Sequence, residues 1–217
     1  MLRTILLFLS LFAVACTPGP GDTDLTDGAD DPDNSIVDSE DDHNNFGIGN
    51  DTSEPIIPPS NITWDACASI EGEHPCNITT IDHLGENFGL YALYGRPIVL
   101  DFSAGWCGPC RNAAQHAQEV QDLYRDTGLL YITVLVETAN GDVPTQDDIN
   151  EWADTYGNTD SLVIAGSRAM LESAGGDWAL SGWPTFYYID REMVLRDIDR
   201  GYNAEEVVYS IEWLLAL

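Results

Sequence analysis

Apolar residues in the second half of the chain follow two patterns that alternate along the sequence. Short runs rich in Val, Ile and Leu at residues 98–102 and 129–136 predict buried strands of a parallel sheet. Apolar residues that recur every three or four positions predict amphipathic helices at 111–126, 145–156 and 204–215. Strands that alternate with helices are typical of the α/β class, with right-handed connections between parallel strands.

The last third of the chain adds shorter elements to this alternation. Residues 161–165 form a short apolar run that predicts a strand, and residues 167–173 fit a short helix. Two β-leaning runs at 185–189 and 193–198 are separated by a polar Asp-Arg-Glu turn, which predicts an antiparallel hairpin. The domain is therefore expected to end in a hairpin followed by a helix.

Residues 1–15 have the pattern of a signal peptide. Arg3 gives a short positive region, and the apolar run at 5–14 is too short to span a bilayer. The run ends in Ala13-Val14-Ala15-Cys16, which resembles the lipobox of bacterial lipoproteins, although Ala13 stands where Leu is usual. In this interpretation Cys16 carries lipid and attaches the mature chain to a membrane that it does not span. The alternative is an ordinary secretory signal with an incidental cysteine.

Residues 16–60 form the lipidated cysteine and a predicted acidic linker. Between Thr17 and Ser60 the chain has twelve Asp or Glu residues and no Lys or Arg, among many Gly, Pro, Ser and Asn. Such a segment buries too little apolar surface to offset its ordering entropy, and its charges repel one another. We therefore expect a disordered spacer in front of one folded domain at 61–217.

The charge of the whole chain narrows the choice of partners. The net charge is −29, and all eight basic residues are Arg, because the sequence contains no Lys. Without the twelve acidic residues of the linker, the rest of the chain still has a net charge of −17. A charge of this sign argues against nucleic acid and anionic lipid headgroups as partners.

The candidate chemistry lies in Trp106-Cys107-Gly108-Pro109-Cys110, between the first predicted strand and the helix that follows it. Two thiols at this spacing can form a reducible disulfide. The first sulfur then lies near helix amide N–H groups and the positive end of the helix dipole, which favours the thiolate that attacks disulfides. We predict redox chemistry here, and the alternatives are a static disulfide or half of a metal site.

Residues 97–215 resemble the thioredoxin-fold domain of exported, membrane-anchored thiol–disulfide oxidoreductases of the TlpA and ResA type. The resemblance rests on the cysteine motif after a strand and on Gly182-Trp183-Pro184-Thr185 before the hairpin. It implies a thioredoxin-like α/β fold, with a central mixed sheet flanked by helices and an N-terminal extension. It also implies a cis peptide bond before Pro184, which then lies against the active disulfide.

The two cysteines and one acidic residue have expected roles. Cys107 is nearest to the helix start and is expected to be the exposed nucleophile, whereas Cys110 lies deeper as the resolving thiol. Asp101 matches an acidic residue that thioredoxins bury beneath the disulfide to move the proton of the second cysteine, and burial is expected to raise its pKa. Thioredoxins usually add a nearby Lys, which this chain lacks. The proton transfer is therefore left in doubt or runs through water alone, and the alternative is an Asp101 turned toward solvent.

Neighbouring residues are expected to shape the site. Trp106 and Trp183 would flank the disulfide and offer an apolar surface to a substrate chain, unless both are ordinary half-buried aromatics. Gly108 and Pro109 shape the turn, and Pro109 is tolerated early in the helix because an N–H there would have no partner. Glu137, at the end of the second strand, is expected to be solvated rather than to tune the thiols.

Cys67 and Cys76 precede the redox motif in a stretch that contains Pro and Gly. We predict a structural disulfide between them, and the alternative is a second redox pair that relays electrons to the motif. The Cys-x8-Cys spacing is poor for zinc, so we expect neither a metal nor another cofactor.

These inferences predict a monomeric enzyme, attached through lipid on Cys16 and facing the periplasm in the envelope of a Gram-negative-type bacterium. It would exchange disulfides with protein substrates and an unidentified electron donor, by resemblance as a reductant rather than an oxidant. A thiol peroxidase is one alternative, although the run before Cys107 lacks the Pro that such chemistry needs. A non-catalytic binding module with a thioredoxin fold is the other.

Overall fold

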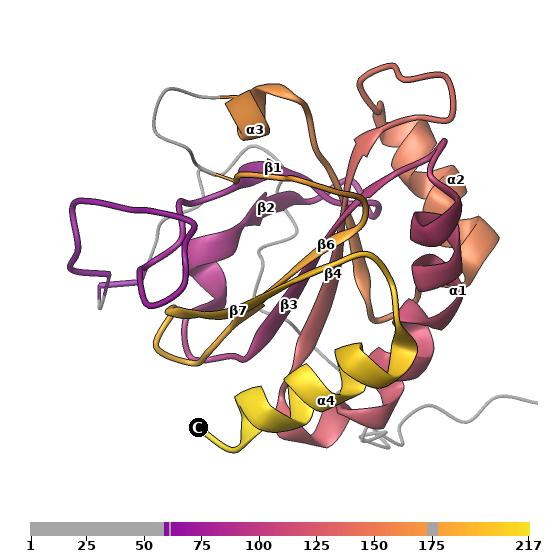
Figure 1. Cartoon of the computed structure of the whole chain (residues 1–217). Helices are drawn as coiled ribbons and strands as arrows, with labels where there is room; N and C mark the ends of the chain where they lie inside the picture. Colours follow the sequence, from indigo (N-terminus) through magenta and orange to yellow (C-terminus); the bar gives the residue numbers. More distant parts are fainter. Residues whose placement is uncertain (1–58, 61, 173–177) are drawn as a thin grey trace, which may run out of the picture. The chain divides into compact units, whose positions relative to one another are not determined.

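A five-stranded mixed sheet organises the folded part of the chain (Figure 1). The computed structural model describes residues 59–60, 62–172 and 178–217. The strand order is β5-β4-β3-β6-β7, in which β3, β4 and β5 are mutually parallel while β6 and β7 are antiparallel to their neighbours. The strands are β3 Ile98–Ala104, β4 Leu130–Glu137, β5 Leu162–Ala165, β6 Thr185–Ile189 and β7 Leu195–Arg200. The predicted α/β fold with a mixed central sheet is confirmed.

Helices α1, α2 and α4 pack on one face of the sheet (Figure 1). They span Gly108–Leu123, Gln146–Tyr156 and Ala204–Leu215, and the short helix η2 (Arg125–Thr127) follows α1. The opposite face and the β5 edge are covered by the segments before β3 and between β5 and β6. These segments contain β1 Thr79–Ile81, β2 Asn87–Gly89, η1 Leu90–Leu93 and α3 Ala169–Glu172.

Strand β3 is buried along its whole length, which explains its nearly continuous apolar sequence. Its side chains alternate between the two faces: Leu100 and Phe102 belong to the larger core, whereas Val99 faces the core beneath α1 and α4. Asp101 shares the face of Val99. The strand therefore carries a carboxyl group into the buried layer beneath α1 and α4.

Several boundaries differ from the predicted ones for local reasons. Helix α1 starts at Gly108 rather than Arg111, because Cys107 already acts as its N-cap. Its last residue, Leu123, is 66% exposed although it fits the apolar spacing. Strand β7 starts at Leu195 because Met193 has a positive φ of 58° in the turn before it. The three-residue strands β1 and β2 were not predicted, since they are too short to show a period of two.

The predicted signal peptide, Cys16 and most of the predicted linker lie outside the described residues, so their assignments remain predictions. Within the described part of the chain, no helix combines the length and the apolar character that crossing a bilayer would require.

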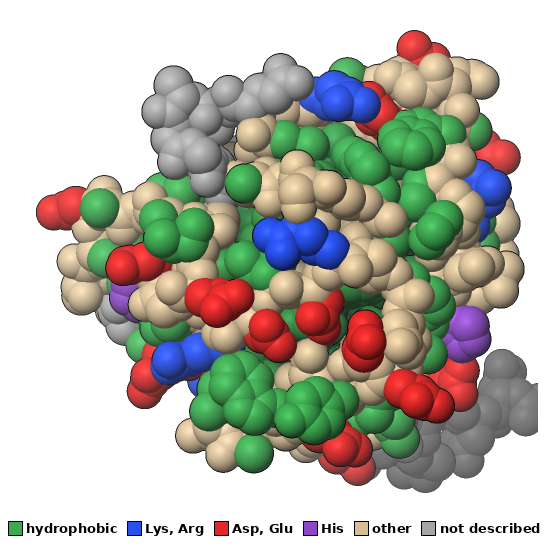
Figure 2. Space-filling model, in the orientation of Figure 1, with side chains coloured by type: hydrophobic (Ala, Val, Ile, Leu, Met, Phe, Trp, Pro, Cys, Tyr) green, Lys and Arg blue, Asp and Glu red, His purple; other side chains and the backbone are tan. Residues whose placement is uncertain are grey.

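Acidic side chains dominate the charged surface of the folded domain. On the face shown in Figure 2 they are more frequent than basic ones and gather between β7 and α4. Part of this charge comes from β7, where Asp197 and Asp199 each accept a hydrogen bond from Ser210 of α4. The surface agrees with the net negative charge that disfavours polyanionic partners.

Cys67 and Cys76 form a disulfide whose loop rests on the turn between β6 and β7. The Gly72 N–H donates to the Leu195 carbonyl oxygen at 2.8 Å, and the Leu195 N–H donates to the Glu73 carbonyl oxygen at 2.9 Å. This turn follows Ile189, which pairs with Ile98 at the start of β3. Cys107 lies beyond the other end of β3, about 20 Å away along a seven-residue strand. This separation favours a structural disulfide over an electron relay.

Replacing both Cys67 and Cys76 by Ser should lower the free energy of unfolding by about 2–3 kcal/mol, because the open loop gains conformational entropy in the unfolded chain. Denaturant unfolding monitored by tryptophan fluorescence measures this change. An unchanged midpoint would show that the backbone hydrogen bonds to Leu195 hold the loop without the disulfide.

Candidate active site

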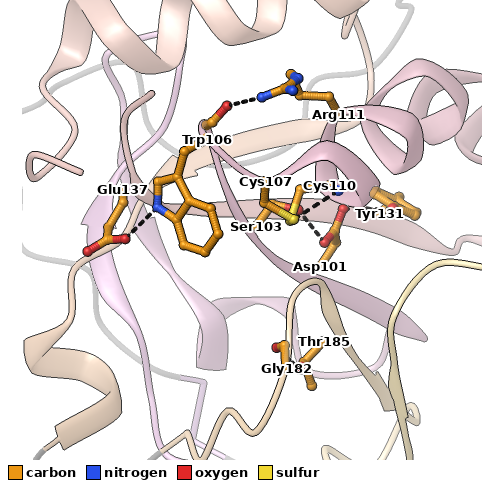
Figure 3. The surroundings of a disulfide bond; sticks show 11 residues. Asp101, Ser103, Trp106, Cys107, Cys110, Arg111, Tyr131, Glu137, Gly182 and Thr185 are labelled. Carbon is orange, nitrogen blue, oxygen red and sulfur yellow. Dashed lines mark hydrogen bonds between the residues drawn. A yellow bond between two sulfur atoms is a disulfide. The ribbon is translucent and has the colours of Figure 1, made fainter. Parts of the chain in front are cut away.

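Cys107 ends the turn after β3 and caps helix α1. Its backbone is extended (φ −81°, ψ 119°), and its Sγ accepts the Cys110 N–H at 3.2 Å. The two cysteines are joined by a disulfide, shown in Figure 3, and Gly108 and Pro109 form the first helical positions between them. The first sulfur therefore lies at the N-terminus of the helix, where an N–H group already points at it.

The cysteines are less accessible than expected. Cys107 is 4% exposed and Cys110 is fully buried, so the prediction of an exposed Cys107 is wrong, although it remains the more accessible of the two. Trp183 packs against the cluster that Cys107 and Cys110 form with Ala104 and contributes to this burial. The Trp183–Pro184 peptide bond is cis, as predicted, and Pro184 is buried.

Trp106 and Trp183 form an aromatic pair beside the disulfide. Their ring centroids are 5.8 Å apart with planes at 71°, an edge-to-face arrangement. Trp106 is 43% exposed and Trp183 is half-buried, so the pair presents an apolar surface to solvent at the mouth of the site.

Glu137 is buried and paired, and the prediction of a solvated carboxylate is wrong. It is 6% exposed, accepts the Trp106 Nε1–H at 2.7 Å and forms an ion pair with Arg168. The hydrogen bond from Arg168 is the main cause that holds the pKa of Glu137 below its ordinary value, and the Trp106 N–H adds to it. These residues meet because the ends of β3 and β4 and the segment after β5 gather at one edge of a parallel sheet. Arg168 could not be linked to this site from sequence spacing.

The turn that carries Trp106 is fixed against the end of β4 by its backbone. The Gly105 N–H donates to the Glu137 carbonyl oxygen at 2.8 Å, and Arg111 Nη1 donates to the Gly105 carbonyl oxygen at 2.7 Å. A Cβ atom at Gly105 would lie 2.5 Å from the Ala139 backbone nitrogen, so only glycine allows this close approach.

Asp101 lies beneath the disulfide (Figure 3) and is completely buried. Ser103 Oγ donates to Oδ1 at 2.7 Å, and the Tyr131 hydroxyl donates to Oδ2 at 3.0 Å. Burial raises the pKa of Asp101 to about 7, and the hydrogen bonds from Ser103 and Tyr131 oppose the rise. At neutral pH this carboxyl group can therefore both take up and release a proton.

Sequence reasoning missed Ser103 and Tyr131, the two residues that donate hydrogen bonds to Asp101. Thr133 is the register partner of Asp101 on β4, and Tyr131 lies on the same face as Thr133 one strand period earlier. The alternation along β4 could have pointed to Tyr131 once the pairing of β3 with β4 was known. Within the described residues, no group of three or more His, Cys, Asp or Glu side chains could hold a metal ion.

A model of the AhpC/TSA family matches residues 72–198, which include both active-site cysteines and the cis-proline. The chain belongs to the AhpC/TSA family. The chain is similar to a thioredoxin-like protein, YneN, of Bacillus subtilis, which is 27% identical over 131 residues, or 60% of this chain and 72% of the relative. The thiol-disulfide oxidoreductase ResA of Halalkalibacterium halodurans is 24% identical over 149 residues, or 69% of this chain and 79% of ResA.

Solved structures agree with this membership at the level of the fold. A putative thiol:disulfide interchange protein DsbE from Chlorobium tepidum superposes with a TM-score of 0.55 at 21% identity, covering 67% of this chain and 98% of that structure. The thioredoxin domain of a Bacteroides vulgatus thiol-disulfide oxidoreductase gives 0.57 at 15% identity, with the same coverage. The predicted thioredoxin-like family and the enzyme class of thiol–disulfide oxidoreductases are confirmed.

Replacing Asp101 by Asn should stabilise the folded protein in a pH-dependent way. Because burial raises the pKa from 3.8 to about 7, the native state keeps a proton that the unfolded chain loses between these values, so the stability of the parent falls as the pH rises through this range. Above pH 7 the buried Asp101 of the parent is charged. The difference between the two pKa values corresponds to a loss of about 4 kcal/mol in the free energy of unfolding. The stability advantage of Asp101→Asn should therefore be small near pH 4 and reach a few kcal/mol near pH 8.

Thermal unfolding of parent and variant across this pH range measures the advantage. The same substitution at Asp147, which is exposed on α2, controls for the loss of one negative charge. An advantage for Asp101→Asn that does not depend on pH would contradict the raised pKa.

Proposed function

We propose that this protein is an exported, membrane-attached oxidoreductase that reduces disulfides of protein substrates, with Cys107 as its nucleophile. The observation that carries the proposal is the position of the Cys107 sulfur at the N-terminus of α1, where it accepts the Cys110 N–H at 3.2 Å. An N–H donor and the helix dipole both stabilise a thiolate at this atom. The cis-proline loop on one side and buried Asp101 beneath complete the arrangement.

The reaction starts from the reduced dithiol. The Cys107 thiolate attacks one sulfur of the substrate disulfide, a mixed disulfide forms, and the other substrate sulfur leaves as a thiolate that takes a proton from solvent. Cys110 gives its proton to Asp101, and its thiolate attacks Cys107 Sγ. The Cys107–Cys110 disulfide forms as the second substrate sulfur leaves, so the substrate gains two electrons and the dithiol loses two. An external thiol donor then restores the dithiol.

The substrate surface is formed by the rim of the disulfide. Trp106 and Trp183 supply apolar area, while Gly108 and Pro109, between the two cysteines, add no large side chain to the rim. A Cβ atom at Gly108 would meet no atom within 4 Å, which agrees with an open rim on this side. An extended segment of a partially unfolded protein, with one cystine sulfur over Cys107, suits this surface.

Attachment to a membrane rests on the sequence. Three features of the sequence support a lipid-bearing N-terminus that a spacer joins to the domain. They are the apolar run before Cys16, the lipobox pattern at Cys16 and the acidic segment up to residue 60. Incorporation of labelled fatty acid into the full-length chain, and its loss in Cys16→Ala, tests this part of the proposal separately from catalysis.

Cys107→Ala should abolish reduction of insulin disulfides by dithiothreitol-fed enzyme, because no thiolate remains to open the substrate. Cys110→Ser should instead accumulate mixed disulfides with its substrates, since Cys107 still attacks but no thiol releases the product. Non-reducing gels followed by mass spectrometry of the adducts measure trapping, and Cys107→Ala/Cys110→Ser is the matched control without adducts.

Full insulin reduction by Cys107→Ala would overturn the assignment of the nucleophile. Rapid consumption of peroxide by the parent, without disulfide reduction, would favour a thiol peroxidase. An inert Cys107 in alkylation after mild reduction would favour a non-catalytic binding module.

Trp106→Phe should lower kcat/KM for insulin by about tenfold or more, because a hydrogen bond to a charged group contributes about 1.5–3 kcal/mol and this one positions the ring. The variant keeps an aromatic ring but cannot donate to Glu137. Trp213→Phe, on α4 with a similar exposure of 41%, is the matched control. Equal effects of the two substitutions would exclude Trp106 from the substrate surface.

A further inference from the structure

The buried carboxyl group of Asp101 needs a route by which its proton reaches solvent. Asp101 and Ser103 are both completely buried on β3, and Trp183 packs against the cluster that contains Cys107 and Cys110. Titratable, hydroxyl and charged groups from several elements lie around Asp101 or line the cavity next to Tyr131. Around Asp101 and Tyr131 they are Ser103 of β3, Thr133 of β4, Cys110 of α1, Tyr188 of β6, and Tyr202 between β7 and α4. His116 and Glu119 of α1 line the cavity.

The position opposite Asp101 offers a hydroxyl instead of a cation. Thr133 pairs with Asp101 across β3 and β4, and its buried Oγ1 has no hydrogen-bond partner. The chain has no Lys at all. A basic group therefore cannot compensate the carboxylate from this position, and the hydrogen bonds of Asp101 come from hydroxyl groups.

Tyr131 is the group that connects Asp101 to an accessible space. Its hydroxyl donates to Asp101 Oδ2 at 3.0 Å, and its side chain also lines a cavity of about 170 Å³ between α1 and α4. His116, Glu119 and Tyr202 line the same cavity. Because Glu119 is exposed and His116 is half-buried, the cavity reaches the surface beside α1. Ser103, by contrast, holds only Oδ1 and is fully enclosed.

We propose that Tyr131 is a positioning residue that passes the proton of Asp101 to the cavity between α1 and α4. The inference rests on the proposed function, since it concerns the step in which Cys110 is deprotonated. Asp101 receives the Cys110 proton on Oδ2 and gives it to the Tyr131 oxygen, while Tyr131 releases its own hydroxyl proton to solvent in the cavity. Tyr131 is neutral before and after the step, and Asp101 returns to the carboxylate.

The experiment separates the two thiol steps with dithiobis-nitrobenzoate (DTNB), a small aromatic disulfide. The Cys107 thiolate attacks DTNB and releases one nitrothiobenzoate, and Cys110 then attacks the mixed disulfide and releases the second. Stopped-flow absorbance of the reduced protein therefore shows two phases. The first reports the reactivity of Cys107, and the second reports the deprotonation and attack of Cys110.

Tyr131→Phe should slow the second phase about tenfold and leave the first within twofold, a loss smaller than that expected for removing a whole general base. The pH at which the second phase is half-maximal should rise, because Asp101 loses a donor that favours its carboxylate. Asp101→Asn should slow the second phase further and remove this pH dependence. Asp101→Asn/Tyr131→Phe should then be no slower than Asp101→Asn alone, because both residues act in one path.

Two further variants exclude a merely structural effect. Tyr187→Phe removes a buried hydroxyl that donates to the Ala179 carbonyl oxygen at 2.9 Å on the opposite face of the sheet, and both phases should be unchanged. Ser103→Ala removes the other donor to Asp101, so it should raise the half-maximal pH without slowing the second phase at high pH. If Tyr131→Phe fails to fold, widening the cavity by Val208→Ala should leave both phases intact, whereas Val208→Phe should slow only the second.

The outcomes separate the proposed function from the role of Tyr131. Absence of the first phase in the parent protein overturns the proposed function itself. The role of Tyr131 is overturned if the parent shows both phases and Tyr131→Phe does not slow the second. It is also overturned if Tyr187→Phe slows the second phase as much as Tyr131→Phe does. In both of these cases the proposed function stands.

Discussion

The structure of the site depends on a single cap: the Cys107 sulfur accepts the Cys110 N–H at the first turn of α1. A helix start leaves N–H groups without partners, and a cysteine sulfur is an unusual acceptor for one of them. The strand β3 ends just before this turn, so the same local geometry that starts the helix also fixes where the reactive sulfur lies. The stabilisation of charge at the Cys107 sulfur and the start of the helix are therefore consequences of one interaction.

A second constraint comes from the surroundings of that cap. The turn cannot move away from β4, because Gly105 and Trp106 are bonded to the backbone and the side chain of Glu137. Arg168 completes the charge balance of Glu137 from the segment after β5. Three consecutive parallel strands thus contribute to the mouth of the site, and the carboxyl edge of the sheet brings their ends together.

In the proposed function, Asp101 sets catalysis against stability. A charged carboxyl group inside β3 lowers stability, and Ser103 and Tyr131 offset only part of the loss, since the pKa stays near 7. A carboxyl group with this pKa is also suited to the proton transfer with Cys110 that we propose. The destabilising residue is then also the one that moves the proton, and perturbed pKa values of this kind cluster at functional sites.

The sequence by itself determined the elements and the reactive pair. The strand at 98–102, the helix at 204–215, the cysteine motif and the cis bond at Pro184 follow from local periodicity, local turn chemistry and a family motif. Only the tertiary structure decided the burial of Cys107, the pairing of Glu137 and the partner of Asp101. These depend on Trp183, Arg168 and Tyr131, which lie 76, 31 and 30 residues away along the chain. Contacts of this kind depend on the order and register of the strands in the sheet. Local periodicity predicts single strands and helices but does not determine that order.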